Sequence, residues 1–166
     1  QKTLEVETHD FKYAPRARLD RNELECLIQR IEKTTGNLSF GLDIGDNIHP
    51  SDYGIVGYIF MNCADLKQAL NYSFKYKRIL NHALGGDFFQ DGDYYHYQLN
   101  NSLDNKNLAP LIELDMASGI QLARFLVGKD LSYRVKIKTI HFQHQPLAPL
   151  ETYRRIFNCP VRFGQT

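Results

Sequence analysis

The sequence contains no tryptophan and only three cysteines among its 166 residues. Cys26, Cys63 and Cys159 are odd in number and lie far apart, so they have neither the density of a disulfide framework nor the close spacing of a zinc site. The formal net charge is only +1, which gives the chain no overall electrostatic attraction for nucleic acid. We therefore expect reduced, structural thiols and no direct DNA binding by this chain.

Long apolar runs are also absent. No run reaches the roughly 18 residues that a membrane-spanning helix needs, and the N-terminal residues lack the charged and then apolar pattern of a secretion signal. The default expectation is a cytoplasmic protein without a membrane partner. The apolar fraction of 43% and the charged fraction of 23% are ordinary for a globular protein, and the length fits a single domain over residues 1–166.

The most informative stretch runs from residue 49 to residue 81 and predicts two helices. The first half, from Tyr53 to Met61, is almost wholly apolar and predicts a mostly buried helix, in which Gly54 and Gly57 would let another backbone approach closely. The second half predicts an amphipathic helix, because apolar or small residues recur at helical spacing. These residues are Leu66, Ala69, Leu70, Ser73, Tyr76 and Leu80. We expect the rest of the chain to pack on this helix pair.

Elsewhere the pattern predicts a mixture of helices and strands. Helical spacing predicts helices over residues 20–36, 110–128 and 150–157, and an Asp91-Gly92 turn between aromatic runs predicts a β-hairpin. Residues 133–142 predict a strand with a bulge near Thr139, and residues 160–163 a brief strand. Residues 38–44 fit either a short strand or a turn of helix. The expected fold class is α+β, with an antiparallel sheet that contains a β-hairpin and is flanked by several helices.

Three stretches carry a family resemblance. Pro50 to Tyr58 resembles a "P-x-D-[FY]-G-L-L-G-Y" segment. Asp65 to Leu70 and Lys75 to Leu80 resemble "T-L-x-x-A-L" and "R-Y-x-x-L-L" segments. Residues 141–164, which include His144, Pro146 and the run Phe157-Asn158-Cys159-Pro160-Val161, resemble the closing signature "F-x-H-x-x-P … Y … F-x-C-P-V-x-F-G".

These motifs resemble the N-terminal effector domain, of the arabinose-binding-like kind, of AraC-type transcription regulators, and the resemblance extends from about Arg16 onward. Cys63-Ala64-Asp65 departs from the Ser-Pro-Thr of the family, so Asp65 or Asn62 must cap the following helix. The resemblance implies a non-enzymatic, dimeric sensor of a small organic effector, without a cofactor. It also implies that DNA is bound only through a C-terminal helix-turn-helix domain, which this sequence lacks, so we expect a piece of a longer regulator.

Aromatic residues with hydroxyl groups make a suitable pocket lining, and the chain has 10 tyrosines and 10 phenylalanines. We expect a sheet face with Phe89, Tyr95 and Tyr97 to oppose helices with Tyr58 and Tyr76. Such an arrangement encloses either a solid core or a ligand cavity. The residues predicted to line a ligand site are Tyr58, Tyr76, Arg78, Phe89 and Tyr97.

Sites for metals and catalysis find little support. His141 and His144 are three apart, so in a strand they point to opposite faces. The aspartates around Gly92 lack the last carboxylate of an EF-hand and fit hairpin chemistry better. No serine or cysteine lies in an activated context, so we predict no catalytic residue and no metal site. The alternative functions are a pure dimerisation or protein-partner module without a metabolite, and an enzyme that lacks a recognisable signature.

Overall fold

The computed structural model describes residues 21–80, 85–100, 108–128 and 135–164. Its elements, in chain order, are α1 (Arg21–Thr35), α2 (Phe40–Asp46), the 3₁₀ helix η2 (Pro50–Tyr53), α3 (Ile55–Met61), α4 (Leu66–Leu80), β1 (Gly85–Asp91), β2 (Tyr94–Asn100), α5 (Ala109–Val127), β3 (Ile140–His141), α6 (Leu150–Phe157) and β4 (Val161–Arg162). Strands β1 and β2 form the predicted antiparallel hairpin, whereas β3 and β4 form a separate parallel pair. The predicted α+β class is confirmed.

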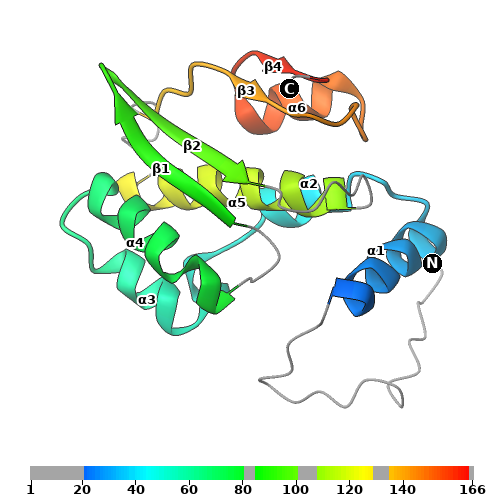
Figure 1. Cartoon of the computed structure of the whole chain (residues 1–166), viewed down its shortest axis with the longest axis horizontal. Coiled ribbons are helices and arrows are strands. Elements are labelled where there is room, and N and C mark those ends of the chain that lie inside the picture. The colour runs from blue at the N-terminus through cyan, green and yellow to red at the C-terminus, as the bar shows by residue number, and fades with distance from the viewer. Residues whose placement is uncertain (1–20, 81–84, 101–107, 129–134, 165–166) are drawn as a thin grey trace.

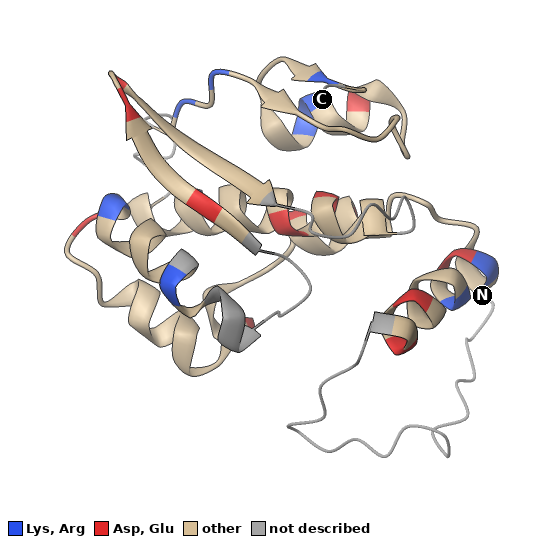
Figure 2. Cartoon of the chain, viewed as in Figure 1, with Lys and Arg blue, Asp and Glu red and all other residues tan. Residues whose placement is uncertain are grey.

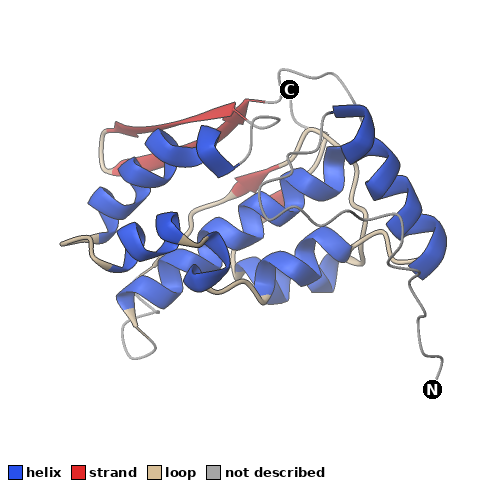
Figure 3. Cartoon of the chain, turned by 90° about the horizontal axis from the view of Figure 1, so that it is seen from below, coloured by secondary structure: helices blue, strands red, loops and turns tan. Residues whose placement is uncertain are grey.

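Helix α5 lies at the centre of the molecule (Figure 1). The hairpin lies against α4 and α5, with α3 beyond α4 (Figures 1 and 3). α6 and its two short strands lie on the side of α5 away from α3 (Figure 1). α5 is apolar on several faces and contributes to more than one buried cluster, as a helix that is covered all round must. Ala117 packs in a cluster with Phe142 and Phe157, and Leu122 packs in another with Val56 and Phe60.

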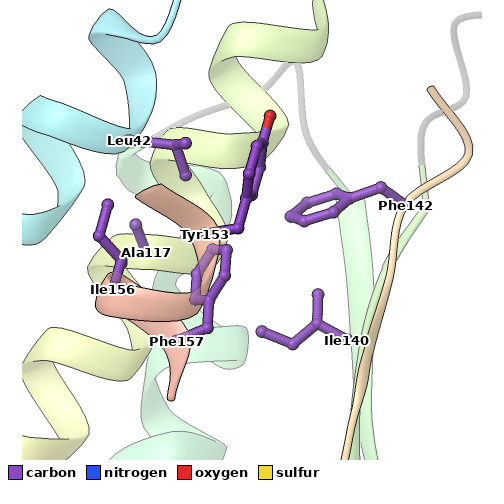
Figure 4. Packing of buried hydrophobic residues seen from close by; sticks show 7 residues of the cluster. All are labelled: Leu42, Ala117, Ile140, Phe142, Tyr153, Ile156 and Phe157. Atoms are coloured by element: carbon purple, nitrogen blue, oxygen red, sulfur yellow. The ribbon is translucent and has the colours of Figure 1, made fainter. Parts of the chain in front are cut away.

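The largest cluster joins α5 to the C-terminal elements (Figure 4). Phe142, Tyr153 and Phe157 are buried there, and their ring centroids lie about 6 Å apart in tilted or edge-on pairs. Such aromatic pairs stabilise a core beyond the area that they bury. The aromatic residues of the closing sequence motif therefore attach α6 and the β3–β4 pair to α5.

Gly57 and Gly41 each allow a close approach of another backbone segment. A Cβ on Gly57 of α3 would overlap the carbonyl of Pro50, and a Cβ on Gly41 of α2 would overlap the carbonyl of Pro110 at the start of α5. The predicted close approach at Gly57 is confirmed. Gly54 instead has a positive φ of 54° and open space around it, so glycine is needed there for its backbone conformation.

The structure shows which residue caps α4 and which conformation residues 38–44 adopt. Asp65 Oδ1 accepts a hydrogen bond of 2.7 Å from the backbone N–H of Gln68, so Asp65 caps α4, as one of the two predicted alternatives has it. Residues 38–44, which fitted a strand or a helix, lie mainly in helix α2. The first residue of the predicted helix over residues 20–36 lies outside the described residues.

Two predictions about local structure are wrong. The helix over residues 53–61 is only half buried, since Ile55 is 73% exposed and Tyr58 59% exposed on the face opposite to Val56 and Phe60. An apolar composition shows that a helix can be buried, but only the neighbouring elements decide how many of its faces are covered. Residues 135–139 form no strand, and strand β3 is confined to Ile140–His141. Alternation of apolar and polar residues indicates that a segment can form a strand, but a strand also needs a partner to pair with.

Acidic and basic residues are spread over the elements, with acidic positions on α5 and on the hairpin (Figure 2). No described helix is both long enough and apolar enough to span a bilayer.

Candidate functional site

A cavity lies where α3, α4, β2 and α5 meet, and its volume is about 60 Å³. Sites for drug-sized ligands are larger, roughly 300–1,000 Å³, so this cavity fits a small molecule. Its walls are mainly apolar. The apolar lining residues are Phe60, Leu66, Ala69, Leu70, Leu122, Ala123 and Leu126.

Tyr97 and Asp115 supply the strongest polar feature of the cavity. The hydroxyl of Tyr97, on β2, donates a hydrogen bond of 2.7 Å to Oδ2 of Asp115, on α5. Burial and the nearby Asp115 carboxylate raise the pKa of Tyr97 well above its ordinary value, so this phenol remains protonated and keeps donating. Gly119, one turn after Asp115, leaves room for the Tyr97 ring, whose hydroxyl would lie 3.8 Å from a Cβ at that position.

Two further hydroxyl groups line the cavity. Tyr53, at the end of η2, has a raised pKa because of burial, to which the negative charge of Asp115 adds. Ser73 on α4 donates a hydrogen bond of 2.7 Å to the carbonyl of Leu70 in its own helix. The Ser73 hydroxyl is thus already hydrogen-bonded. The polar groups on the side of the cavity near β2 and α5 are those of Tyr53, Tyr97 and Asp115.

A second pocket of about 290 Å³ adjoins the first and shares Phe60, Leu66, Ala69 and Leu126 with it. Its outer wall is the α3–α4 connection, which includes Cys63 and Asp65. Burial and the charge of Asp65 raise the pKa of the Cys63 thiol, which also donates to the carbonyl of Ile59 at 3.2 Å. This thiol is therefore not activated as a nucleophile.

Of the residues predicted to bind a ligand, Tyr97 lines the cavity. Tyr76 is half buried and packs on the cluster of Val56, Phe60 and Leu122 next to the cavity, without being part of its lining. Tyr58 is 59% exposed on the outer face of α3, and Phe89 is 45% exposed. The side chain of Arg78 lies outside the described part of the structure. The ligand-binding role of these residues stays a prediction.

The hairpin register separates Phe89 from Tyr97. Phe88 pairs with Tyr97, while Phe89 pairs with His96 and stacks on it with ring centroids 5.0 Å apart. Because paired residues of an antiparallel ladder share a face and neighbouring residues alternate, Phe89 and Tyr97 lie on opposite faces. The expectation that one face carries both residues is therefore wrong, because the observed register places Phe88 and not Phe89 beside Tyr97.

A second polar group is buried in the core between α5 and α6. Glu113 is fully buried and accepts a short hydrogen bond from the Tyr153 hydroxyl, while Nε2 of His144 lies 3.9 Å from Oε1 of Glu113. Burial raises the pKa of Glu113 to about 7, although the bond from Tyr153 opposes this shift. Burial lowers the pKa of His144. Oε2 of Glu113 and Nε2 of His144 have no hydrogen-bond partner among the described residues.

Sequence reasoning missed both carboxylates of α5. The available signal was their position, since Glu113 and Asp115 interrupt the otherwise apolar run from Pro110 to Ala117. Residues two apart on a helix are about 200° apart around its axis. Glu113 therefore faces α6, while Asp115 faces the cavity.

The described residues include no group of three or more His, Cys, Asp or Glu side chains placed to hold a metal ion. His144 donates through Nδ1 to the carbonyl of Gln145 at 2.8 Å, and His141 is exposed.

Comparisons with known proteins agree with the sequence motifs. Residues 10–166 match the family described as the arabinose-binding domain of AraC transcription regulators, N-terminal. Over 154 residues the chain is 25% identical to the ornithine utilization regulator of Pseudomonas aeruginosa. This match covers 92% of the chain and 44% of that regulator, so the chain spans less than half the length of this relative.

Proposed function

Because the chain belongs to the family of N-terminal arabinose-binding domains of AraC transcription regulators, we propose that it binds a small organic effector in the cavity between α3, α4, β2 and α5. We further propose that residues 1–166 form a single sensing and oligomerisation domain. This domain performs no catalysis and is located in the cytoplasm. A helix-turn-helix domain outside this sequence would bind DNA.

The cavity is the observation that supports this proposal most directly. Small-molecule sites are concave and mainly apolar, with a few polar groups that orient the ligand. The cavity has such walls. Tyr97 is hydrogen-bonded to Asp115, and Tyr53 lies close enough to feel the charge of Asp115. The resemblance to a regulator of ornithine utilization makes ornithine and other amino acids sensible first compounds to test.

A route for signal transfer runs through α5. Asp115 and Leu122 face the cavity, and Arg124 of the same helix donates to the carbonyls of Ile156 and Phe157 at 2.7 Å and 3.1 Å. A ligand that prefers one position of α5 would therefore shift the C-terminal elements as well. Such a shift requires a difference in ligand affinity between the two arrangements.

The exposed apolar face of α3 favours homodimerisation as a second function. Ile55, Tyr58 and Met61 are 73%, 59% and 38% exposed, and they follow one another at three-residue spacing on a short helix. An apolar patch of this kind is typical of a protein interface. Sedimentation that gives a strict monomer at high protein concentration would argue against this role.

A thermal-shift screen tests the sensing function, because a ligand that binds the folded state stabilises it by mass action. The compounds are amino acids including ornithine, fatty acids, aromatic acids and sugars. The proposal expects at least one compound to raise the melting temperature of the chain. It also expects Ala69→Leu, which fills the cavity with a larger side chain, to abolish that rise.

The matched control is Asn71→Leu, which places leucine at an exposed position of the same helix and should respond as the wild type does. The absence of any stabilising compound contradicts the proposal. Equal stabilisation of wild type and Ala69→Leu places the ligand elsewhere and contradicts it too.

A further inference from the structure

Glu113 and His144 form a buried polar pair that the proposed function does not use. Glu113 lies on α5 and its side chain is fully buried, while His144 lies between β3 and α6 with a side chain that is 11% exposed. Nε2 of His144 is 3.9 Å from Oε1 of Glu113. The two side chains therefore meet where the central helix faces the C-terminal elements.

His144 is also attached to the last described residues of the chain. Its ring packs on Phe142 and Phe163, with ring centroids 4.9 Å and 6.3 Å apart. Its carbonyl accepts a hydrogen bond of 3.3 Å from the backbone N–H of Gly164. A change in the position of His144 relative to Glu113 is therefore also a change in the position of this C-terminal segment relative to α5.

The hydrogen bond of His144 determines which ring nitrogen carries a hydrogen. Nδ1 is 2.8 Å from the carbonyl of Gln145, and a carbonyl can only accept, so Nδ1 is the donor. In the neutral ring, Nε2 is then an acceptor that faces another acceptor, the Glu113 carboxylate. Neither Nε2 nor Oε2 of Glu113 has a hydrogen-bond partner among the described residues. Two buried acceptors without a proton between them are unfavourable.

A single proton removes this conflict. If Glu113 holds the proton, its O–H can donate to Nε2 of His144. If Nε2 holds it, the imidazolium can donate to the carboxylate. In both cases one hydrogen bond joins the two side chains, and shortening the present 3.9 Å to about 2.9 Å is sufficient to form it.

We propose that Glu113 and His144 share one proton, whose uptake and release close and open a hydrogen bond between α5 and the segment that precedes α6. Protons are then an input to the domain that requires no ligand in the cavity. Burial raises the pKa of Glu113 to about 7, so the shared proton is released near neutral pH. Burial lowers the pKa of His144, so a second proton binds only at lower pH. The contact is closed below about pH 7 and open above it.

Tyr153 of α6 is the third titratable group at this contact. Its hydroxyl donates to Oε1 of Glu113 and accepts a hydrogen bond of 2.8 Å from the backbone N–H of Leu147. The bond from Tyr153 lowers the pKa of Glu113 against the effect of burial. Because this bond occupies Oε1 whether or not Glu113 is protonated, it leaves Oε2 for the proton.

The other charged groups of the described surrounding elements do not replace this proton. Asp46 of α2 pairs with Arg155 at 2.9 Å, and Arg124 of α5 donates to the last carbonyls of α6. Asp115 accepts from a tyrosine on the opposite side of α5. Cys159 stays a neutral thiol because burial raises its pKa. The remaining charged side chains of α2, α6 and the β3–β4 pair are exposed.

An NMR titration of the chain with ¹³C-labelled glutamate carboxyls measures the proton on Glu113 between pH 5 and pH 9. The Glu113 signal is assigned by its absence from Glu113→Gln. In the wild type it should titrate with a midpoint near 7, well above the ordinary 4.5. His144→Phe keeps an aromatic ring but removes the acceptor, so the midpoint should fall by about half a pH unit to one pH unit, a roughly three- to tenfold loss of proton affinity.

Labelling histidine with ¹⁵N measures the other side of the contact. Because a shared proton affects both groups, the Nε2 signal of His144 should change with the same midpoint as the Glu113 carboxyl. In Glu113→Gln this change near pH 7 should disappear, because the glutamine amide donates to Nε2 at every pH. The control Glu151→Gln removes an exposed glutamate of α6 and should leave both titrations as they are in the wild type.

Three results would overturn the proposal. The first is a wild-type Glu113 midpoint near 4.5, because the pair would then hold no proton at neutral pH. The second is an unchanged Glu113 midpoint in folded His144→Phe. If that variant does not fold, the ¹⁵N measurement decides, and an Nε2 change near pH 7 that persists in Glu113→Gln is the third.

Discussion

Replacing Glu113 by glutamine should change how the stability of the protein depends on pH. The glutamine oxygen can still accept the hydrogen bond from Tyr153, so the variant removes the titrating group and keeps the packing. In the wild type, burial raises the pKa of this carboxyl from 4.5 to about 7. The folded state thus favours the protonated form more strongly than the unfolded state does.

The raised pKa of Glu113 determines how the stability of the protein changes with pH. Between pH 4.5 and 7 the folded protein holds a proton on Glu113 that the unfolded chain has already released. The stabilising contribution of protonated Glu113 is therefore fully present below pH 4.5 and is lost as the pH rises through about 7. Once both states are ionised, the loss amounts to about 3 kcal/mol, of which about 2.5 kcal/mol falls between pH 5 and pH 8.

Urea unfolding of the wild type and Glu113→Gln at pH 5, 6, 7 and 8 measures this effect. Relative to the wild type, the variant should gain about 2.5 kcal/mol in unfolding free energy between pH 5 and pH 8. His144, whose pKa is lowered by burial, is present in both proteins, so its own titration contributes to both curves. Glu151→Gln is the matched control, because it removes an exposed glutamate from α6 and should follow the wild-type curve. Parallel curves for wild type and Glu113→Gln would refute the reasoning.

Three other substitutions test contacts that hold the fold. Gly57→Ala should destabilise the protein by about 1–3 kcal/mol, because its Cβ would overlap the carbonyl of Pro50. Gly119→Ala, whose Cβ would make only an ordinary contact of 3.8 Å with the Tyr97 side chain, is the control that should cost nothing in a urea titration. Arg124→Ala should cost about 2–4 kcal/mol, since it removes charged donors from the last carbonyls of α6, and near-wild-type stability in the same assay would contradict this role. Asp65→Ala should cost about 1 kcal/mol through loss of the α4 cap, whereas Asp65→Asn, which can still cap, should cost much less.

The local patterns of the sequence predicted most elements correctly. The Asp91-Gly92 turn produced the hairpin, and helical spacing produced α4, α5 and α6. These features depend on residues close together in the chain, so a window of sequence contains the necessary information. The centre of the fold could not be predicted in this way. Residues 49–81 were expected to hold that place, but α5 takes part in the clusters on both sides.

For the ligand site too, the local sequence contains part of the information and the long-range pairing of strands contains the rest. Aromatic content predicted a pocket wall and included Tyr97, but it could not decide the side of the hairpin that faces the helices. The hydrogen bond from Tyr97 to Asp115 shows that the Tyr97 face meets α5. The pairing of Phe88 with Tyr97 places Phe88 on that face, and a shift of one residue would have placed Phe89 there. Long-range register is not encoded in any short window.

The two carboxylates of α5 show why position in the fold, rather than residue type, sets the chemistry. Glu113 and Asp115 lie two residues apart in one apolar helix, and helical geometry turns them to nearly opposite sides. Glu113 meets Tyr153 in a closed core, where burial favours its neutral form. Asp115 accepts a hydrogen bond from Tyr97 beside a cavity. Removing the charge of Glu113 should therefore change the free energy of unfolding mainly above pH 5, because the buried carboxyl is largely protonated below that pH.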